Sequence, residues 1–105
     1  MATNHKITLS LGAIGVEANP SETAAKVNDV VTFFSGDGSQ MIIRFFKNQS
    51  PFRTGNGAVI KTVQASKPHT CMIEGDYSFF CEIRDESGDI VAYDIDNGGD
   101  LNVGH

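Results

Sequence analysis

With 105 residues, the chain is long enough for a single domain, residues 1–105, with a core of its own. Its 13 acidic residues outnumber 8 scattered basic ones, and the formal net charge of −5 argues against nucleic-acid or anionic-membrane partners. No apolar run approaches the roughly 20 residues that a membrane-spanning helix needs. Because no signal-type apolar segment follows the polar start, we expect a cytoplasmic protein, with a secreted form whose leader has been removed as the alternative.

Three segments in the first half of the chain alternate apolar and polar residues and are predicted to be strands: 6–11, 30–34 and 40–46. The residues that share one face of these segments are Ile7, Leu9, Leu11, Val31, Phe33, Met41, Ile43 and Phe45. Gly12 and Gly15 loosen the chain after the first segment. Residues 21–26 are predicted to be an extended connection, because only one helical turn would fit before the turn signal Asn28-Asp29.

The second half begins with the longest irregular segment, Lys47–Gly57, in which Pro51-Phe52 is expected to anchor the loop on the sandwich. Strands are predicted at 58–64, at 69–73 and around Ile90, Val91 and Tyr93. The tail from Asp94 to His105 is acidic and glycine-rich, with Leu101 and Val103 as candidates for a final strand.

The segment Glu74–Ile83 reads as the central strand. Tyr77, Phe79, Cys81 and Ile83 share one face, which is apolar or thiol throughout, and Phe80 lies on the other face between two polar residues. Phe80 could fill a second contact or lie in an exposed patch. Short strands at this spacing, without a convincing helix, predict an all-β protein: an antiparallel Greek-key β-sandwich of seven to eight strands.

Two stretches resemble the cupredoxin family. Asn28–Phe34, the Asp37 loop and Met41–Phe45 resemble the turn, strand, loop and strand that end at the first copper histidine of that family. Gly75–Cys81 resembles the strand that delivers its copper cysteine. The resemblance covers about Val27 to Val91 and implies a cupredoxin-like sandwich.

The chain departs from that pattern at the copper ligands. Gln40-Met41 stand where the first histidine belongs, and the positions after Cys81, which would hold a histidine and a methionine, carry Arg84, Asp85, Glu86 and Ile90. The histidines His5, His69 and His105 lie elsewhere. The resemblance therefore implies a copper-free member of the family, with no cofactor and no inherited electron transfer.

Three other groups have possible chemistry. Cys81 could be a nucleophile or a metal ligand, but its apolar face favours a buried thiol, and we expect Cys71 and Cys81 to be free, with a bridge as the alternative. His69 and Cys71 could form a metal pair, although neighbours two apart on a strand merely share a face. Asp94–Asp100 has the carboxylate density of a calcium loop without an EF-hand's closing glutamate, which favours a solvated acidic loop.

These observations favour a non-enzymatic binding or protein-interaction module whose partner is an unidentified protein or small ligand. Its contacts are expected on the polar loop, because loops held by a rigid sandwich commonly carry binding residues. The residues predicted to bind are Asn48, Gln49, Phe52, Arg53 and Asn56. A copper or calcium protein, or a small enzyme using Cys81, is the alternative, and the sequence does not indicate the oligomeric state.

Overall fold

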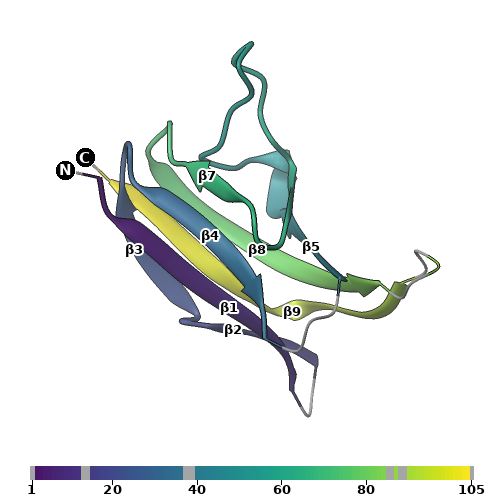
Figure 1. Ribbon diagram of the computed structural model, residues 1–105. Coiled ribbons are helices and arrows are strands. Elements are labelled where there is room, and N and C mark those ends of the chain that lie inside the picture. The colour runs from purple at the N-terminus through teal and green to yellow at the C-terminus, as the bar shows by residue number, and fades with distance from the viewer. Residues whose placement is uncertain (1, 13–14, 37–39, 85–86, 88–89, 105) are drawn as a thin grey trace.

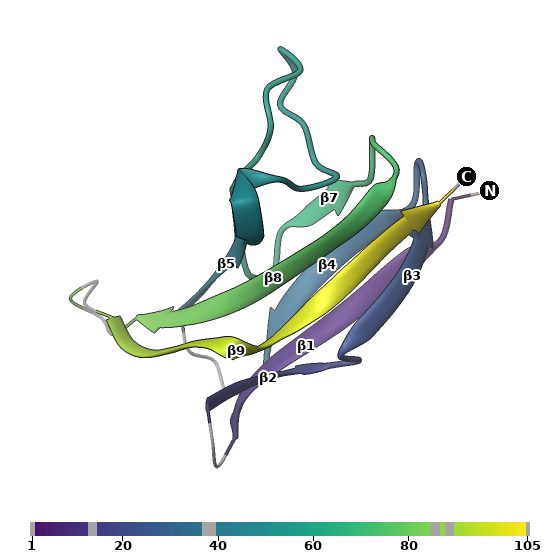
Figure 2. The ribbon, with the colours of Figure 1, turned by 180° about the vertical axis from the view of Figure 1, so that it is seen from behind.

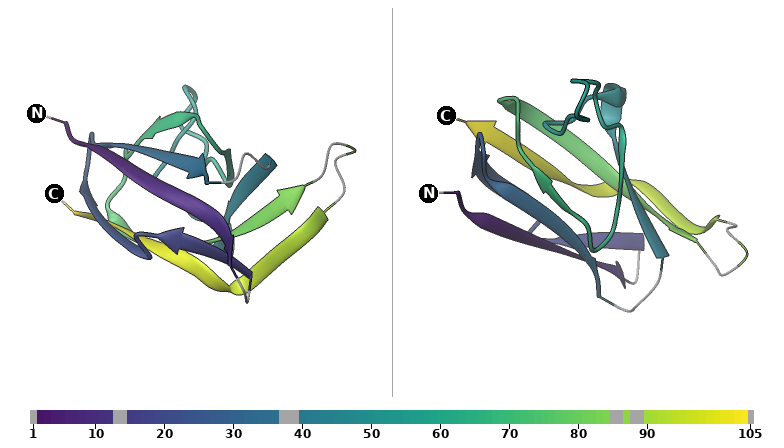
Figure 3. Two further views of the ribbon diagram at one scale, coloured as in Figure 1. Left: turned by 60° about the horizontal axis from the view of Figure 1, so that its bottom comes forward. Right: turned by 45° about the horizontal axis from the view of Figure 1, so that its top comes forward.

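The computed structural model describes residues 2–12, 15–36, 40–84, 87 and 90–104, which form two layers of β-sheet (Figure 1 and Figure 3). One sheet has the strand order β2-β1-β4-β7, with bounds Gly15–Asn19, Asn4–Gly12, Val30–Ser35 and Pro68–Thr70. The other has the order β3-β9-β8-β5-β6, with bounds Glu22–Lys26, Ile90–Gly104, Gly75–Arg84, Gln40–Phe45 and Thr62–Gln64. A short 3₁₀ turn, η1 (Phe46–Asn48), follows β5. No helix in these ranges is long and apolar enough to cross a bilayer.

The core lies between the inner faces of the two sheets. Alternation along each strand turns every second side chain inward. The inward residues of β1 and β4 are Ile7, Leu9, Val31 and Phe33, and those of β5 and β8 are Met41, Ile43, Phe45, Tyr77, Phe79 and Cys81, all buried. The predicted faces are therefore confirmed, except for Leu11 and Ile83, whose side chains lie outside the described part of the chain.

The sheets are mixed, and the expectation of a purely antiparallel sandwich was wrong. β1 pairs with β4 in parallel, with Ile7 opposite Phe33, and β3 pairs with β9 in parallel, with Ala25 opposite Val103. A parallel pair needs a crossover between its strands. Here β2 and β3 supply that crossover, so β4 returns beside β1 in the same direction. These two strands also raise the number in the described ranges to nine, above the seven or eight predicted.

Short chain connections join the edge strands of the two sheets on both lateral sides of the sandwich. The turn at Pro20-Ser21 carries the chain from β2 to β3, and residues 65–67 carry it from β6 to β7. The Asp100 N–H donates to the Ser21 carbonyl over 2.8 Å, and the Ser66 N–H donates to the Phe33 carbonyl over 2.6 Å. Each bond thus fastens its connection to the strand next to a sheet edge, β9 in the first case and β4 in the second.

β9 is one long strand, and the predicted acidic loop at Asp94–Asp100 was wrong. The strand pairs with β8 on both sides of a register shift that falls between Phe79 and Cys81. At Gly98 a β-carbon would overlap the Phe79 carbonyl oxygen, so this crossing requires glycine. Leu101 and Val103 are buried, which confirms their place in the final strand.

Two other predicted strands are shorter than expected. In the predicted strand 58–64, only Thr62–Gln64 lie in a strand, which is β6. The predicted strand 69–73 is replaced by the shorter β7, which covers Pro68–Thr70. Residues 58–61 belong instead to the loop that Phe52 anchors, since Val59 bridges to Arg53 and the Ile60 carbonyl accepts the Ser50 hydroxyl. Loop 49–61 protrudes beyond the sandwich (Figure 1).

Candidate functional site

The five residues predicted to bind are not brought together. Asn48, Gln49 and Asn56 are exposed, but Asn48 lies in η1, whereas Asn56 lies in a turn closed by the Gly57 N–H and the Thr54 carbonyl, 2.9 Å apart. Asn48 lines one of the two hollows described below.

Phe52 and Arg53 hold the loop in place. The Phe52 ring is 1% exposed and meets the Phe45 ring edge to face, with centroids 5.8 Å apart, so the expected anchor is confirmed. The guanidinium of Arg53 donates through Nη1 to the carbonyls of Ser50 and Phe52 over 2.5 and 2.9 Å. In this arrangement the Phe52 ring is not accessible to a partner, and Arg53 is half-buried.

An aromatic pair lies on the outer face of the five-stranded sheet, on the side opposite the core. The rings of Phe46 and Phe80 have centroids 5.0 Å apart and are tilted by 52°. Phe45 pairs with Phe79, so Phe46, one position further, lies beside Ser78 and diagonally across from Phe80. Both rings are half-buried. Figure 2 shows η1 alongside the outer face of β8.

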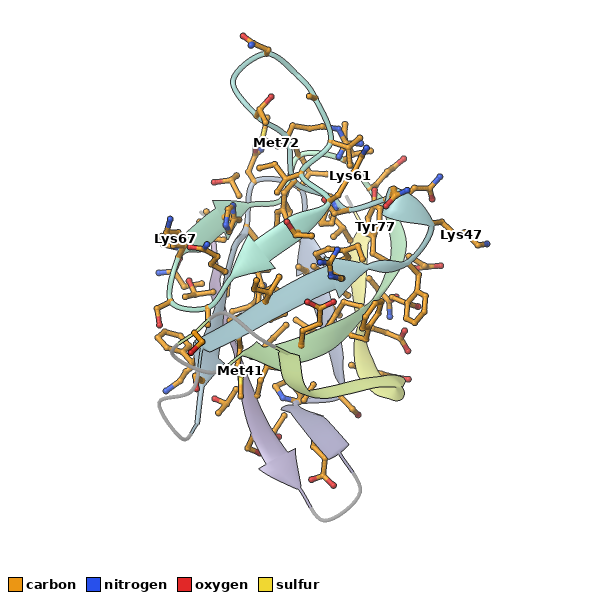
Figure 4. The ribbon with its side chains drawn as sticks, turned by 90° about the vertical axis from the view of Figure 1, so that its right-hand side faces the viewer. Met41, Lys47, Lys61, Lys67, Met72 and Tyr77 are labelled. Carbon is orange, nitrogen blue, oxygen red and sulfur yellow. The ribbon has the colours of Figure 1, made fainter. Side chains whose placement is uncertain are left out.

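A hollow of about 500 Å³ adjoins this pair on the β6 side. Besides the two rings it is lined by Arg44, Lys47, Asn48 and Lys61. Figure 4 shows Lys47 projecting outward from the turn, with Lys61 on the same half of the molecule. No ion pair within the described ranges holds Lys47 or Lys61. Lys47 and Lys61 make this hollow locally basic in a protein of net charge −5, while the charge of Arg44 is paired with Glu82.

A second hollow, of about 290 Å³, adjoins Phe46 on the β3 side. It is lined by Ser21, Glu22, Ser78, Gly99 and Asp100 in addition to Phe46. Glu22 pairs with Asp100, and Asp100 with Ser78, across three neighbouring strands. The Ser78 hydroxyl donates to Asp100 Oδ1 over 2.7 Å. This hollow is therefore acidic, and the Phe46 ring separates it from the basic one.

An ion pair braces the outer face next to the rings. Arg44 Nε donates to Glu82 Oε1 over 2.5 Å, and the Glu82 side chain is 6% exposed against 41% for Arg44. Burying a carboxylate costs desolvation free energy unless a charged donor lies beside it. Here the Arg44 guanidinium is that donor. The guanidinium reaches the hollow from this fixed position.

Both cysteines are free and buried, as expected. Desolvation raises the pKa of the Cys81 thiol to about 12. Desolvation, with a smaller contribution from the Asp29 carboxylate, raises the pKa of Cys71 to about 11. Since the thiolate is the reactive and metal-binding form, this environment suits structural cysteines.

His69 packs its ring on Phe52, with centroids 5.2 Å apart, and its Nε2 is buried without a hydrogen-bond partner in the described part of the chain. Burial, with the Lys67 charge as a smaller cause, lowers the pKa of its imidazole. Among the described residues, no group of three or more His, Cys, Asp or Glu side chains could hold a metal, so the pair of His69 and Cys71 that the sequence raised as an alternative has no third ligand there.

The other carboxylates weighed from the sequence fall largely outside the described part. The side chains of Asp94 and Asp96, and residues Asp37, Asp85, Glu86 and Asp89, are in this group. Asp100, which is described, is in the acidic hollow. Because Asp94–Asp100 run along an extended strand, the backbone does not wrap around an ion as a calcium loop does.

The Asp29 carboxylate joins the N-terminal segment to the turn that follows β3. It accepts hydrogen bonds from the N–H groups of Thr3 and Lys26, both 3.0 Å, and from His5 Nε2 at 2.9 Å. The Thr3 bond, the His5 bond and the Lys26 bond, in that order, lower the pKa of Asp29 to about 2. This cluster is structural, because three of the protein's own donors hold the carboxylate.

Comparison with protein-family models finds no family that matches this chain, and comparison with curated proteins finds no relative.

Proposed function

We propose that this protein is a non-enzymatic binding module built on a cupredoxin-like sandwich without a copper centre. Support for the sandwich comes from β5 and β8, the strands of the two resembling stretches, which pair side by side with Ile43 opposite Cys81. The environment of Cys81 supports the lack of a copper centre: its thiol is 1% exposed and its pKa is raised to about 12.

The Phe46–Phe80 pair carries the proposal that the outer face of the five-stranded sheet is the contact surface. Inner-face phenylalanines such as Phe79 complete the core, whereas Phe46 and Phe80 are half-buried on the outer face. Both rings line the larger hollow, and Phe46 also lines the smaller one. Aromatic rings flanked by charged side chains are typical of binding surfaces. Of the residues predicted from sequence, Asn48 belongs to this surface, while the others hold or extend the loop beside it.

Binding of an uncharged aromatic probe tests this proposal. N-acetyl-tyrosine amide, titrated into ¹⁵N-labelled protein, should shift the amide signals around Phe46, Phe80 and Lys61. Replacing both rings, in Phe46→Ala with Phe80→Ala, should abolish these shifts.

Phe34→Ala is the matched control. Phe34 is a half-buried ring on the outer face of the other sheet, with Lys6 Nζ 4.9 Å from its centroid, and its loss should leave the shifts unchanged. Shifts that cluster instead at the exposed Met72 and Ile73, or that persist in the double variant, would contradict the proposed surface.

A further inference from the structure

We infer that the partner is an extended peptide segment with a basic side chain at one end, an apolar side chain in the middle and an acidic side chain at the other end. This inference rests on the proposed binding surface and specifies its ligand. It follows from the order in which charges and rings succeed one another across the sheet.

The charges on the outer face change sign across the strands. Glu22 on β3 and Asp100 on β9 lie at one side, and Ser78 on β8 follows. Phe46 comes next, at the end of β5, and Lys47 and Lys61 lie beyond it. The two hollows thus have opposite charge and share the Phe46 ring as their common wall. A ligand of a single charge would be attracted at one hollow and repelled at the other.

The spacing of these groups matches an extended chain. Neighbouring strands lie about 4.8 Å apart, so Phe46 is roughly 10 Å from Asp100. The Phe45 N–H donates to the Lys61 carbonyl over 3.2 Å, which places the Lys61 backbone one strand further, about 14 Å from Asp100. In an extended peptide, residues i, i+2 and i+4 point to the same side, and the outer two are about 13 Å apart. A single amino acid is too short to span both hollows.

The ligand is expected to lie across the outer face, because the rings and both hollows are on that face. Side chains therefore provide the contacts: a basic group over Glu22 and Asp100, an apolar group against Phe46 and Phe80, and a carboxylate near Lys47 and Lys61. These contacts fit a peptide that runs in either direction. The residue pattern basic–x–apolar–x–acidic and its reverse, in which x is any residue, are therefore equally suitable.

The test compares peptides that differ only in charge. The probes are acetylated and amidated Lys-Ala-Tyr-Ala-Glu, its reverse, Lys-Ala-Tyr-Ala-Lys and Glu-Ala-Tyr-Ala-Glu, titrated by NMR at low ionic strength. At least one mixed-charge peptide should bind roughly threefold to tenfold more tightly than either like-charged peptide, since exposed ion pairs contribute about 0.2–1 kcal/mol each. The preference should shrink as added salt screens the charges.

Lys61→Glu leaves the basic hollow without an excess of positive charge, because Arg44 is already paired with Glu82 and Lys47 is balanced by the new carboxylate. It should therefore remove the advantage of the mixed-charge peptides over Lys-Ala-Tyr-Ala-Lys. Lys67→Glu changes the net charge by the same amount and should leave the preference as it is; Lys67 is exposed on the β6–β7 connection, on the opposite side from Lys47 in Figure 4. Equal binding of all four peptides to the wild type, binding of none, or the same loss of preference in both variants would overturn the inference. Retained binding of N-acetyl-tyrosine amide at Phe46 in any of these cases would leave the proposed function standing.

Discussion

The rings of Phe33 and Phe79 meet edge to face across the sandwich, with centroids 5.1 Å apart and planes at 79°. Phe33 belongs to the four-stranded sheet and Phe79 to the five-stranded sheet, so this contact joins the two layers. Phe79 also meets the Phe45 ring at 5.9 Å. It is therefore the central aromatic residue of the core.

Phe79→Ala should lower the free energy of unfolding by about 3–5 kcal/mol, because it leaves a cavity between the sheets. Domains of this kind have a total stability of roughly 5–15 kcal/mol, so the variant should be close to unfolding. Phe80→Ala should cost clearly less, since Phe80 is half-buried on the outer face. Urea denaturation of both variants measures this, and equal losses would contradict the assignment of the two faces.

Asp29→Asn should destabilise the protein at neutral pH and cease to do so in strong acid. The pKa of Asp29 is about 2 in the folded state against the usual 3.8, so its ionised form favours folding. This contribution is present above about pH 3.8 and disappears as the pH falls toward 2. Urea midpoints of wild type and variant, measured from pH 7 to pH 2, should therefore converge. A difference that stays constant down to pH 2 would refute this role.

His69 should make the protein less stable in mild acid. Its folded-state pKa is lowered from 6.5, so the unfolded chain takes up this proton first as the pH falls. Stability is complete above about pH 6.5 and declines below it. His69→Phe keeps a ring against Phe52 and removes the titration, so thermal melts of this variant should lose less stability than wild type between pH 7 and pH 5. Parallel losses in the two proteins would show that the decline has another source.

The two thiols should be unreactive while the protein is folded. With pKa values of about 11 for Cys71 and about 12 for Cys81, only roughly one thiol in a thousand or fewer is ionised at pH 8. A disulfide reagent at pH 8 should react at the rate of unfolding and should react at once in urea. Added Cu(II) should produce no intense thiolate absorption band in the folded protein. Rapid titration of either cysteine, or a blue complex, would contradict the buried-thiol assignment.

Sequence alternation predicted the strands that build the core, because an inner face reads directly as every second residue. Residues 30–34 and 40–46 follow this rule closely. It did not identify β2, because Gly12 and Gly15 indicated a loosened chain after the first strand, and it did not show that β9 continues through Gly98-Gly99. Alternation also did not predict the parallel pairing of β1 with β4 and of β3 with β9, since strand order depends on contacts between segments far apart in the sequence.

The candidate site was only partly predictable. The loop 47–57 was identified from its polarity, but the same polarity did not reveal that Arg53 is bound to backbone carbonyls. Phe80 was correctly placed on the outer face, and Phe46 lies on the outer face of its own predicted strand. The sequence alone does not show that β5 pairs with β8, and this pairing brings the two rings together. Two outward phenylalanines on different strands were the available signal for such a patch.

The most direct test of the binding surface is to detect which ring protons lie next to a bound probe. Intermolecular nuclear Overhauser effects between the tyrosine ring of N-acetyl-tyrosine amide and the protein's side chains would report this. The account predicts contacts to the ring protons of both Phe46 and Phe80 and none to Phe34. Contacts to Met72 and Ile73 alone, or to Phe34, would contradict it.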